Sequence, residues 1–181
     1  MPTSGGVLLV SNHQSFLDPV LATLALPREC HYMARDTLFR NPFFRWLIES
    51  LNAFPIKRGV ADLRAIKETL RRLKNNQLVV TFPEATRTTD GSIRAMQPGV
   101  ILLARKANVP IVPTLILGAF ESWPRHARLP KPHPVIVAYG PPLAPALLKS
   151  LDDEECIRQV RARILDLQRL YQQHSLLREA G

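Results

Sequence analysis

A histidine and an aspartate five positions apart, His13 and Asp18, are the side chains in this sequence best suited to acid–base chemistry. The short apolar run at residues 6–10 predicts a strand that ends just before the histidine, and Asp18-Pro19 predicts the start of a helix. A carboxylate that accepts a hydrogen bond from one imidazole nitrogen fixes the tautomer, so the other nitrogen can take a proton from a hydroxyl group. Such a base typically contributes about 10²–10⁴ in rate. The alternatives are a plain loop histidine and an aspartate that only caps the helix.

A second polar cluster ends the strand predicted over residues 53–58, where Lys57 and Arg58 stand side by side. The guanidinium group of Arg58 offers a planar fork suited to phosphate, and Lys57 offers a point charge. Because side chains alternate along a strand, only one of the two needs to face a crevice, and we favour Arg58. The alternative is an exposed strand end on a basic surface.

A third cluster follows the strand predicted over residues 78–82 and reads Phe-Pro-Glu-Ala-Thr-Arg-Thr, closed by an Asp-Gly turn. Glu84 and Arg87 stand three positions apart, so each can pair with the other or with a substrate. Thr86, between them, is a further candidate for substrate binding. The alternative is a buried Glu–Arg pair that serves only the fold.

These clusters require a sheet that brings strand ends together, and short apolar runs alternating with helical patterns predict an α/β fold. We expect a single domain over residues 1–181, a mixed β-sheet flanked by helices, with a core at about 7–143 and a C-terminal helix at about 152–175. The predicted strands are 6–10, 31–34, 53–58, 78–82, 111–117 and 135–138, and the predicted helices are 18–26, 43–51, 61–74, 98–106 and the C-terminal one. In helix 61–74 the predicted apolar side consists of Leu63, Ile66, Leu70 and Leu73.

The net charge of +9 lies entirely before residue 132, because Lys and Arg equal Asp and Glu after it. A positively charged surface of this kind attracts nucleic acid, anionic lipid head groups or phosphorylated small molecules. The alternative is that the charge only aids solubility. Cys30 and Cys156 make neither a disulfide framework nor a metal site, which favours a reducing compartment. No signal peptide is visible, and no apolar stretch reaches the roughly 18–20 residues that cross a bilayer.

The three clusters, in this order and spacing, resemble the signature of the glycerophosphate and lysophosphatidate acyltransferases. That signature is Asn-His, four residues and Asp, then an aromatic strand ending in Arg, then Phe-Pro-Glu-Gly-Thr-Arg-Ser. A fourth element, Val-Pro-Ile-Val-Pro, matches residues 109–113, so the resemblance extends over about residues 10–143.

This resemblance implies a glycerophosphate-acyltransferase-like fold and transfer of a fatty acyl group to the free hydroxyl of a lysophosphatidate-like acceptor in phospholipid biosynthesis. It implies His13 as the catalytic base with Asp18 as its partner, and residues 109–113 near the acyl-binding side. The residues expected to bind the acceptor are Arg58, Glu84 and Arg87, with Lys57 and Thr86 beside them. The donor is acyl-CoA or acyl-carrier protein, and no metal or cofactor is expected. Another lyso-lipid or an amine-lipid acceptor stays an alternative.

Two expectations concern details of the loops. Ala85 replaces the usual glycine of the signature, which predicts a loop that does not use glycine's freedom at positive φ. Thr88 replaces serine and keeps a hydroxyl group. We also expect loop backbone N–H groups to stabilise the oxyanion that forms during acyl transfer.

Lipid chemistry would bring the protein to a membrane surface, and we expect a cytoplasmic protein that is peripheral at the inner face of an anionic membrane. The candidate membrane contacts are Phe39, Phe43, Phe44 and Trp46, interleaved with Arg40 and Arg45. The alternative is that this run forms an ordinary buried helix.

Three rival functions remain open from the sequence. A serine hydrolase would use Ser15, but no Gly-x-Ser-x-Gly elbow is present. A basic module that binds nucleic acid or membranes without catalysis would account for the charge, although no recognised nucleic-acid motif is present and no nucleic acid is expected. A catalytically inactive scaffold is the third, and the intact pair of His13 and Asp18 argues against it.

Overall fold

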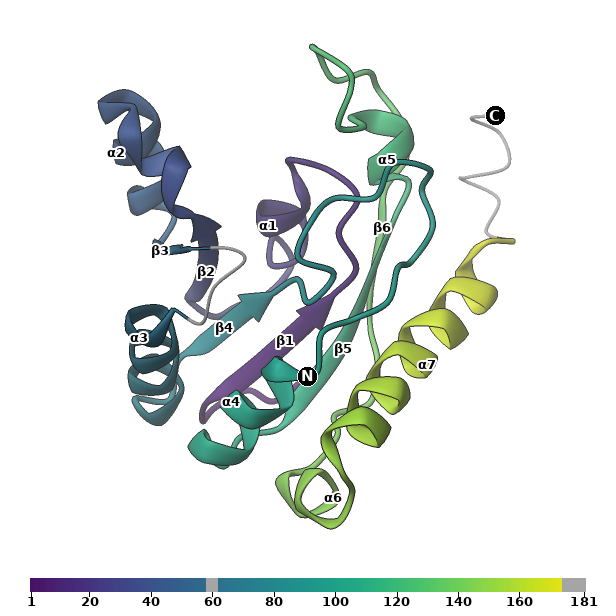
Figure 1. Ribbon diagram of the computed structural model, residues 1–181. Helices are drawn as coiled ribbons and strands as arrows, with labels where there is room; N and C mark the ends of the chain where they lie inside the picture. The colour runs from purple at the N-terminus through teal and green to yellow at the C-terminus, as the bar shows by residue number, and fades with distance from the viewer. Residues whose placement is uncertain (58–61, 174–181) are drawn as a thin grey trace.

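A six-stranded sheet with the order β3-β2-β4-β1-β5-β6 forms the centre of the molecule (Figure 1). The computed structural model describes residues 1–57 and 62–173. The strands are β1 (Val7–Ser11), β2 (Cys30–Arg35), β3 (Ala53–Ile56), β4 (Leu78–Thr81), β5 (Ile111–Leu117) and β6 (Ile136–Tyr139). Neighbouring strands pair in parallel, except that β6 pairs with β5 in the antiparallel sense. The predicted mixed sheet is therefore confirmed.

Helices cover the sheet unequally, with α3, α4, α6 and α7 on one face and the short α1 and α5 near the other. The first group is α3 (Leu63–Lys74), α4 (Gly99–Ala107), α6 (Pro145–Ser150) and α7 (Asp153–Tyr171). The remaining elements are α1 (Asp18–Leu21), the 3-10 helix η1 (Asp36–Arg40), α2 (Pro42–Ser50) and α5 (Ala119–Ser122). In Figure 1, α2 projects at the β3 edge, away from α7. Within the described residues, no helix is both long and apolar enough to span a membrane.

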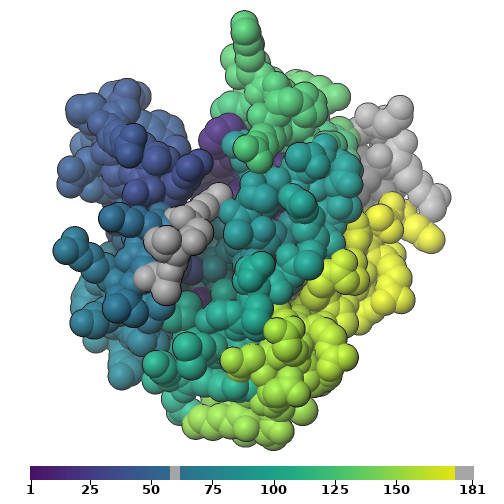
Figure 2. Space-filling model, in the orientation of Figure 1, coloured from purple at the N-terminus to yellow at the C-terminus, as the bar shows by residue number. Residues whose placement is uncertain are grey.

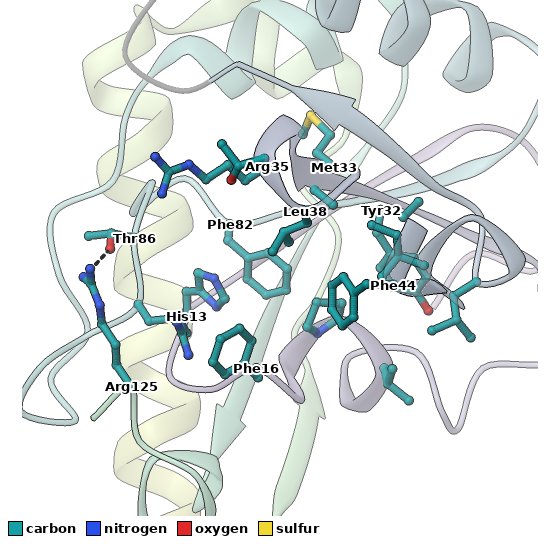
Figure 3. A pocket seen from close by; sticks show the side chains of 18 residues that line it. His13, Phe16, Tyr32, Met33, Arg35, Leu38, Phe44, Phe82, Thr86 and Arg125 are labelled. Atoms are coloured by element: carbon teal, nitrogen blue, oxygen red, sulfur yellow. Dashed lines mark hydrogen bonds between the residues drawn. The ribbon is translucent and has the colours of Figure 1, made fainter. Parts of the chain in front are cut away.

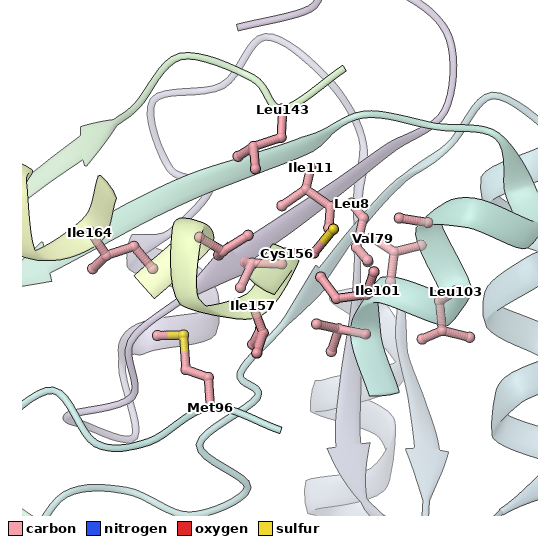
Figure 4. Close-up of a cluster of buried hydrophobic side chains, with 14 of the residues drawn as sticks. Leu8, Val79, Met96, Ile101, Leu103, Ile111, Leu143, Cys156, Ile157 and Ile164 are labelled. Atoms are coloured by element: carbon pink, nitrogen blue, oxygen red, sulfur yellow. The ribbon is translucent and has the colours of Figure 1, made fainter. Parts of the chain in front are cut away.

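The central strand β1 is apolar on both sides because both of its faces are covered. Leu8 and Val10 pack with α4 and α7, whereas Val7 and Leu9 pack toward α1 and α5. Figure 4 shows Leu8 among side chains of α4 and α7. A parallel strand buried on both faces reads as a continuous apolar run, and this is why residues 6–10 gave a strand prediction without alternation.

The parallel register brings two of the polar clusters to one edge of the sheet. Val10 of β1 is the register partner of Thr81 of β4. The loops that follow β1 and β4 therefore leave the sheet side by side, since both strands run in the same direction. The chain after β5 turns at Gly118, whose φ is +88° and where a Cβ would lie 2.1 Å from the carbonyl oxygen of Pro134. Only glycine fits there, and the turn starts the excursion that returns as β6.

Several boundaries differ from the predictions. The helix expected over residues 18–26 is α-helical only to Leu21, and its N-cap is Leu17 instead of Asp18, whose carboxylate binds the preceding loop. In α3, which begins after its Asp62 cap, Leu63 is exposed, whereas Leu73 is buried and Ile66 and Leu70 pack against the core, as predicted. Strand β3 ends at Ile56.

The expectation for Ala85 is wrong, because this alanine adopts a φ of +61°. Its backbone N–H donates to the carbonyl of Phe82, which closes a tight turn directly after β4. A side chain in the left-handed region costs roughly 1–2 kcal/mol. The loop thus keeps a conformation that glycine would adopt more easily.

Candidate functional site

One carboxylate oxygen, Oδ2 of Asp18, organises the loop after β1. It lies 2.7 Å from Nδ1 of His13 and accepts hydrogen bonds from the backbone N–H groups of Gln14, at 2.5 Å, and Ser15, at 2.7 Å. The Asp18 side chain is fully buried. Oδ2 is thus an acceptor in this loop, and an imidazole that donates to it from Nδ1 keeps Nε2 able to take a proton.

The His13 backbone and ring are held from three further directions. The ring stacks on Phe82 at a centroid distance of 4.4 Å. The His13 N–H donates to Oε1 of Glu84 at 3.2 Å, and its carbonyl accepts from the N–H of Thr88 at 2.9 Å. The loops after β1 and β4 therefore fix one another, and the imidazole has little freedom to rotate.

Asn12 secures the start of the same loop, a role that the sequence did not reveal. Its side-chain amide donates to the carbonyl of Ile116 and accepts from the N–H of Ile116, each at 2.8 Å. These two hydrogen bonds join the residue after β1 to the backbone of β5. The Asn12 side chain thus fixes the start of the loop that carries His13.

His13 lines a cavity of about 380 Å³ between the loop after β1 and the α2 region. Figure 2 shows the surface hollowed between the dark blue α2 region and the green segment after β5. Most of its wall is apolar and comes from α1, β2, η1 and α2. Apolar residues of this wall include Val20, Tyr32, Met33, Leu38, Phe44 and Ile48. Residues 109–113, expected near the acyl-binding side, do not line it, because β4 and β1 lie between β5 and β2 in the sheet.

Guanidinium groups stand at the polar side of the cavity (Figure 3). Arg87 lies over the ring of Phe16, 3.5 Å from its centroid. Arg125 donates from Nη1 to Oγ1 of Thr86 at 3.2 Å, and Arg35 at the end of β2 also lines the cavity. Cationic and aromatic groups thus surround His13 on this side.

One predicted substrate-binding residue lies away from the cavity, and another cannot be placed from the described residues. Lys57 is exposed and does not line the cavity, and its backbone N–H is bound by Asp62. Arg58 lies outside the described residues. Among the predicted residues, the structure places His13, Thr86 and Arg87 at the cavity, with Asp18 and Glu84 hydrogen-bonded to His13 behind it.

Glu84 lies behind the histidine loop and does not line the cavity. Oε1 accepts from His13, and Oε2 is buried without a hydrogen bond from the described residues. Burial raises the pKa of Glu84 to about 7, against the lowering effect of the His13 and Arg94 N–H groups. The predicted Glu84–Arg87 pair is not among the contacts of this carboxylate, which instead supports the loop.

Four backbone N–H groups of the histidine loop are engaged within the protein. The N–H groups of Gln14 and Ser15 go to Asp18, that of His13 goes to Glu84, and that of Leu17 goes to Ser15 Oγ. The expected oxyanion donors are therefore to be sought among other loop N–H groups. Ser15 is fully buried with its hydroxyl engaged in this way and does not line the cavity, which removes the geometry that a serine hydrolase needs.

Residues 1–117 match the family model described as Acyltransferase. The chain belongs to the acyltransferase family. The match covers the three clusters and the segment at 109–113, so the resemblance seen in the sequence is confirmed.

Named relatives of this acyltransferase share part of their length with it. The 1-acyl-sn-glycerol-3-phosphate acyltransferase BAT2, chloroplastic, of Brassica napus is 31% identical over 117 residues, which are 64% of this chain and 34% of that protein. The 1-acyl-sn-glycerol-3-phosphate acyltransferase of Bacillus subtilis (strain 168) is 29% identical over 119 residues, covering 65% of this chain and 59% of that protein. The chain therefore spans about a third of the plant protein's length and about three fifths of the bacterial one's.

A solved structure has the same architecture as this acyltransferase. The crystal structure of the 1-acyl-sn-glycerophosphate (LPA) acyltransferase PlsC from Thermotoga maritima is similar with a TM-score of 0.76 and 28% sequence identity. The similarity covers 90% of this chain and 65% of that chain. The predicted fold class is thereby confirmed.

Two residues near His13 were not predicted as site residues. Phe82 appeared in the sequence as the first residue of the third cluster, without a contact to the histidine, and Arg125 belongs to none of the clusters. Within residues 1–57 and 62–173, no group of three or more His, Cys, Asp or Glu side chains could hold a metal ion.

The position of Glu84 predicts a pH-dependent contribution to stability. Its pKa of about 7 in the folded state exceeds the usual value of 4.5, so the folded protein keeps a proton that the unfolded chain releases. The free energy of unfolding of the wild type, relative to Glu84→Gln, should therefore fall as pH rises from about 4.5 to about 7. Denaturant titrations of both proteins across this pH range measure the difference in the free energy of unfolding. A difference that is constant with pH would contradict the raised pKa of the buried Glu84 carboxyl group.

Proposed function

We propose that this chain transfers a fatty acyl group from a thioester donor to the free hydroxyl group of a lysophosphatidate-like glycerophosphate, with His13 as the general base. The observation that carries the proposal is the 2.7 Å contact between His13 Nδ1 and Asp18 Oδ2, at a cavity that is apolar along one side and cationic at the other. The names of the relatives support the acceptor, since those proteins are 1-acyl-sn-glycerol-3-phosphate acyltransferases.

In the proposed reaction, Nε2 of His13 removes the proton of the acceptor hydroxyl as its oxygen attacks the thioester carbon. Asp18 holds the ring in the tautomer whose Nε2 is unprotonated and stabilises the imidazolium that forms. The thiolate of acyl-CoA or of acyl-carrier protein then leaves and receives the proton from His13. No covalent intermediate on the protein is needed, because the donor arrives already activated.

The two sides of the cavity suit different parts of the substrates. An acyl chain fits the wall formed by β2, η1 and α2, since side chains such as Met33, Leu38 and Phe44 contribute apolar surface there. A phosphate fits the side with Arg87 and Arg125, because guanidinium groups bind phosphate oxygens with charge-assisted hydrogen bonds. The hydroxyl to be acylated then lies between the two, next to His13.

The oxyanion of the tetrahedral intermediate needs stabilisation from groups other than four N–H groups of the histidine loop. The loop N–H groups of residues 13, 14, 15 and 17 are used by Glu84, Asp18 and Ser15. Among the described residues, the guanidinium groups of Arg35 and Arg87 line the cavity and can oppose this charge.

Replacement of His13 tests the proposal. His13→Ala should lower kcat for acyl transfer from acyl-CoA to lysophosphatidate by at least about 10²-fold, the lower range for loss of a general base. His126→Ala removes an exposed histidine and should keep wild-type turnover. Product formation is followed by mass spectrometry, and circular dichroism checks that the fold is retained. A folded His13→Ala protein with near-normal kcat would exclude His13 as the base.

We further propose that α2 and its surroundings contact an anionic membrane. No residue of α2 is buried, which contradicts the buried-helix alternative for this segment. Of the four predicted contacts, Phe43 is 72% and Trp46 is 65% exposed, Phe39 is half-buried, and Phe44 lines the cavity. Exposed aromatic groups with arginines beside them suit the head-group region, and the cavity opens next to them.

Vesicle co-sedimentation tests this contact. The double variant Phe43→Ala, Trp46→Ala should bind phosphatidylglycerol vesicles several-fold more weakly than the wild type, since it loses the two most exposed aromatic groups of α2. Leu170→Ala removes an equally exposed apolar residue from α7, at the other side of the molecule, and should bind normally. Equal binding by all three proteins would rule out α2 as the membrane contact.

A further inference from the structure

Arg125 reaches the cavity from a part of the chain that the family match does not include. The match ends at residue 117, and Arg125 belongs to the segment between α5 and β6. In Figure 1 this segment projects beyond the sheet at the edge where the strands β1 and β4 end. The resemblance seen in the sequence extends to about residue 143, but none of its motifs contains Arg125, so it assigns no role to this side chain.

The segment that carries Arg125 is braced at its base. Ser122 and Lys131 exchange two hydrogen bonds, from the Lys131 N–H to the Ser122 carbonyl at 2.8 Å and from the Ser122 hydroxyl to the Lys131 carbonyl at 3.0 Å. The Trp123 indole N–H donates to the carbonyl of Ala127 at 3.1 Å. Because its two ends are tied together, the loop presents Arg125 from a defined position.

The same loop joins the two motif loops through aromatic contacts. The Trp123 ring lies 5.5 Å from the ring of Phe16, and Arg87 covers Phe16. Arg125 itself donates to the hydroxyl of Thr86, one position before Arg87. Figure 3 shows Arg125 and Thr86 on the same side of His13. Two arginines from different segments thus converge on this part of the cavity.

The charges around Arg125 favour an anionic ligand. None of the described residues that line the cavity is an aspartate or glutamate. Between Ser122 and Leu151 the sequence also contains no acidic residue. Within the described residues, the hydrogen-bond partner of the Arg125 guanidinium group is the neutral Thr86 hydroxyl, which an anion can replace with a stronger, charge-assisted bond.

We propose that Arg125 binds the terminal phosphate oxygens of the acceptor together with Arg87, and that this pair selects a phosphate monoester over a phosphodiester. This inference rests on the proposed function, since it names how the acceptor is recognised. A monoester carries about −1.5 to −2 charges near neutral pH and has three terminal oxygens. A phosphodiester carries one negative charge and has two terminal oxygens, so it forms weaker charge-assisted hydrogen bonds with two guanidinium groups.

Kinetics with two acceptors test the selectivity. For Arg125→Ala, KM for lysophosphatidate should rise about tenfold or more, the size expected for a lost charge-assisted hydrogen bond, with kcat changed less than about twofold. KM for lysophosphatidylglycerol, a phosphodiester, should change little, so the preference for the monoester falls. Arg125→Lys should restore part of the preference, since it keeps the charge and loses the fork. Arg128→Ala, an exposed arginine of the same loop that does not line the cavity, is the matched control.

A binding measurement separates this inference from the proposed function. Calorimetric titration of His13→Ala, alone and combined with Arg125→Ala, with a short-chain 1-acylglycerol 3-phosphate below its micelle concentration requires no turnover. Weaker binding in the double variant supports the role of Arg125 even if the wild type shows no acyl transfer. Equal binding in both variants, or an unchanged monoester preference in active Arg125→Ala, overturns the role of Arg125 and leaves the acyltransferase proposal standing.

Discussion

The buried oxygen Oδ2 of Asp18 accepts from Gln14 and Ser15 and lies 2.7 Å from His13 Nδ1, and the arrangement of the site depends on this cluster. A buried carboxylate is costly unless several donors compensate for lost water, and here the backbone itself provides two of them. The same carboxylate oxygen therefore holds both the backbone of the loop and the ring of the proposed base.

The parallel sheet turns this local cluster into a site. Strands β1 and β4 end at the same edge, so Phe82 stacks on His13 and Glu84 supports its backbone, while α2 extends an apolar wall past the end of β2. The segment after β5 adds the cationic side through Arg125. A cavity with a basic group between an apolar wall and guanidinium groups suits a substrate that is part lipid and part phosphate.

The sequence was most informative where periodicity and spacing express burial directly. Continuous apolar runs gave the strands of the sheet, and helical patterns at 43–51 and about 152–175 gave α2 and α7. In the structure the side chains of Asn41 and Asp152 cap these two helices. Spacing also placed His13 beside Asp18. It could not show that Asp18 binds loop N–H groups, that Ala85 adopts positive φ, or that Arg125 lies beside Thr86, 39 positions away. Those features depend on tertiary contacts between segments distant in the chain.

The central claim is that Asp18 holds His13 with its proton on Nδ1 and an unprotonated Nε2. The most direct test is ¹⁵N nuclear magnetic resonance of the His13 ring, at a pH at which the imidazole is neutral, in the wild type and in Asp18→Asn. The account predicts a protonated Nδ1 and an unprotonated Nε2 in the wild type, with this preference weakened in Asp18→Asn. A wild-type ring protonated on Nε2 would contradict it, because that nitrogen could not accept the proton of an attacking hydroxyl.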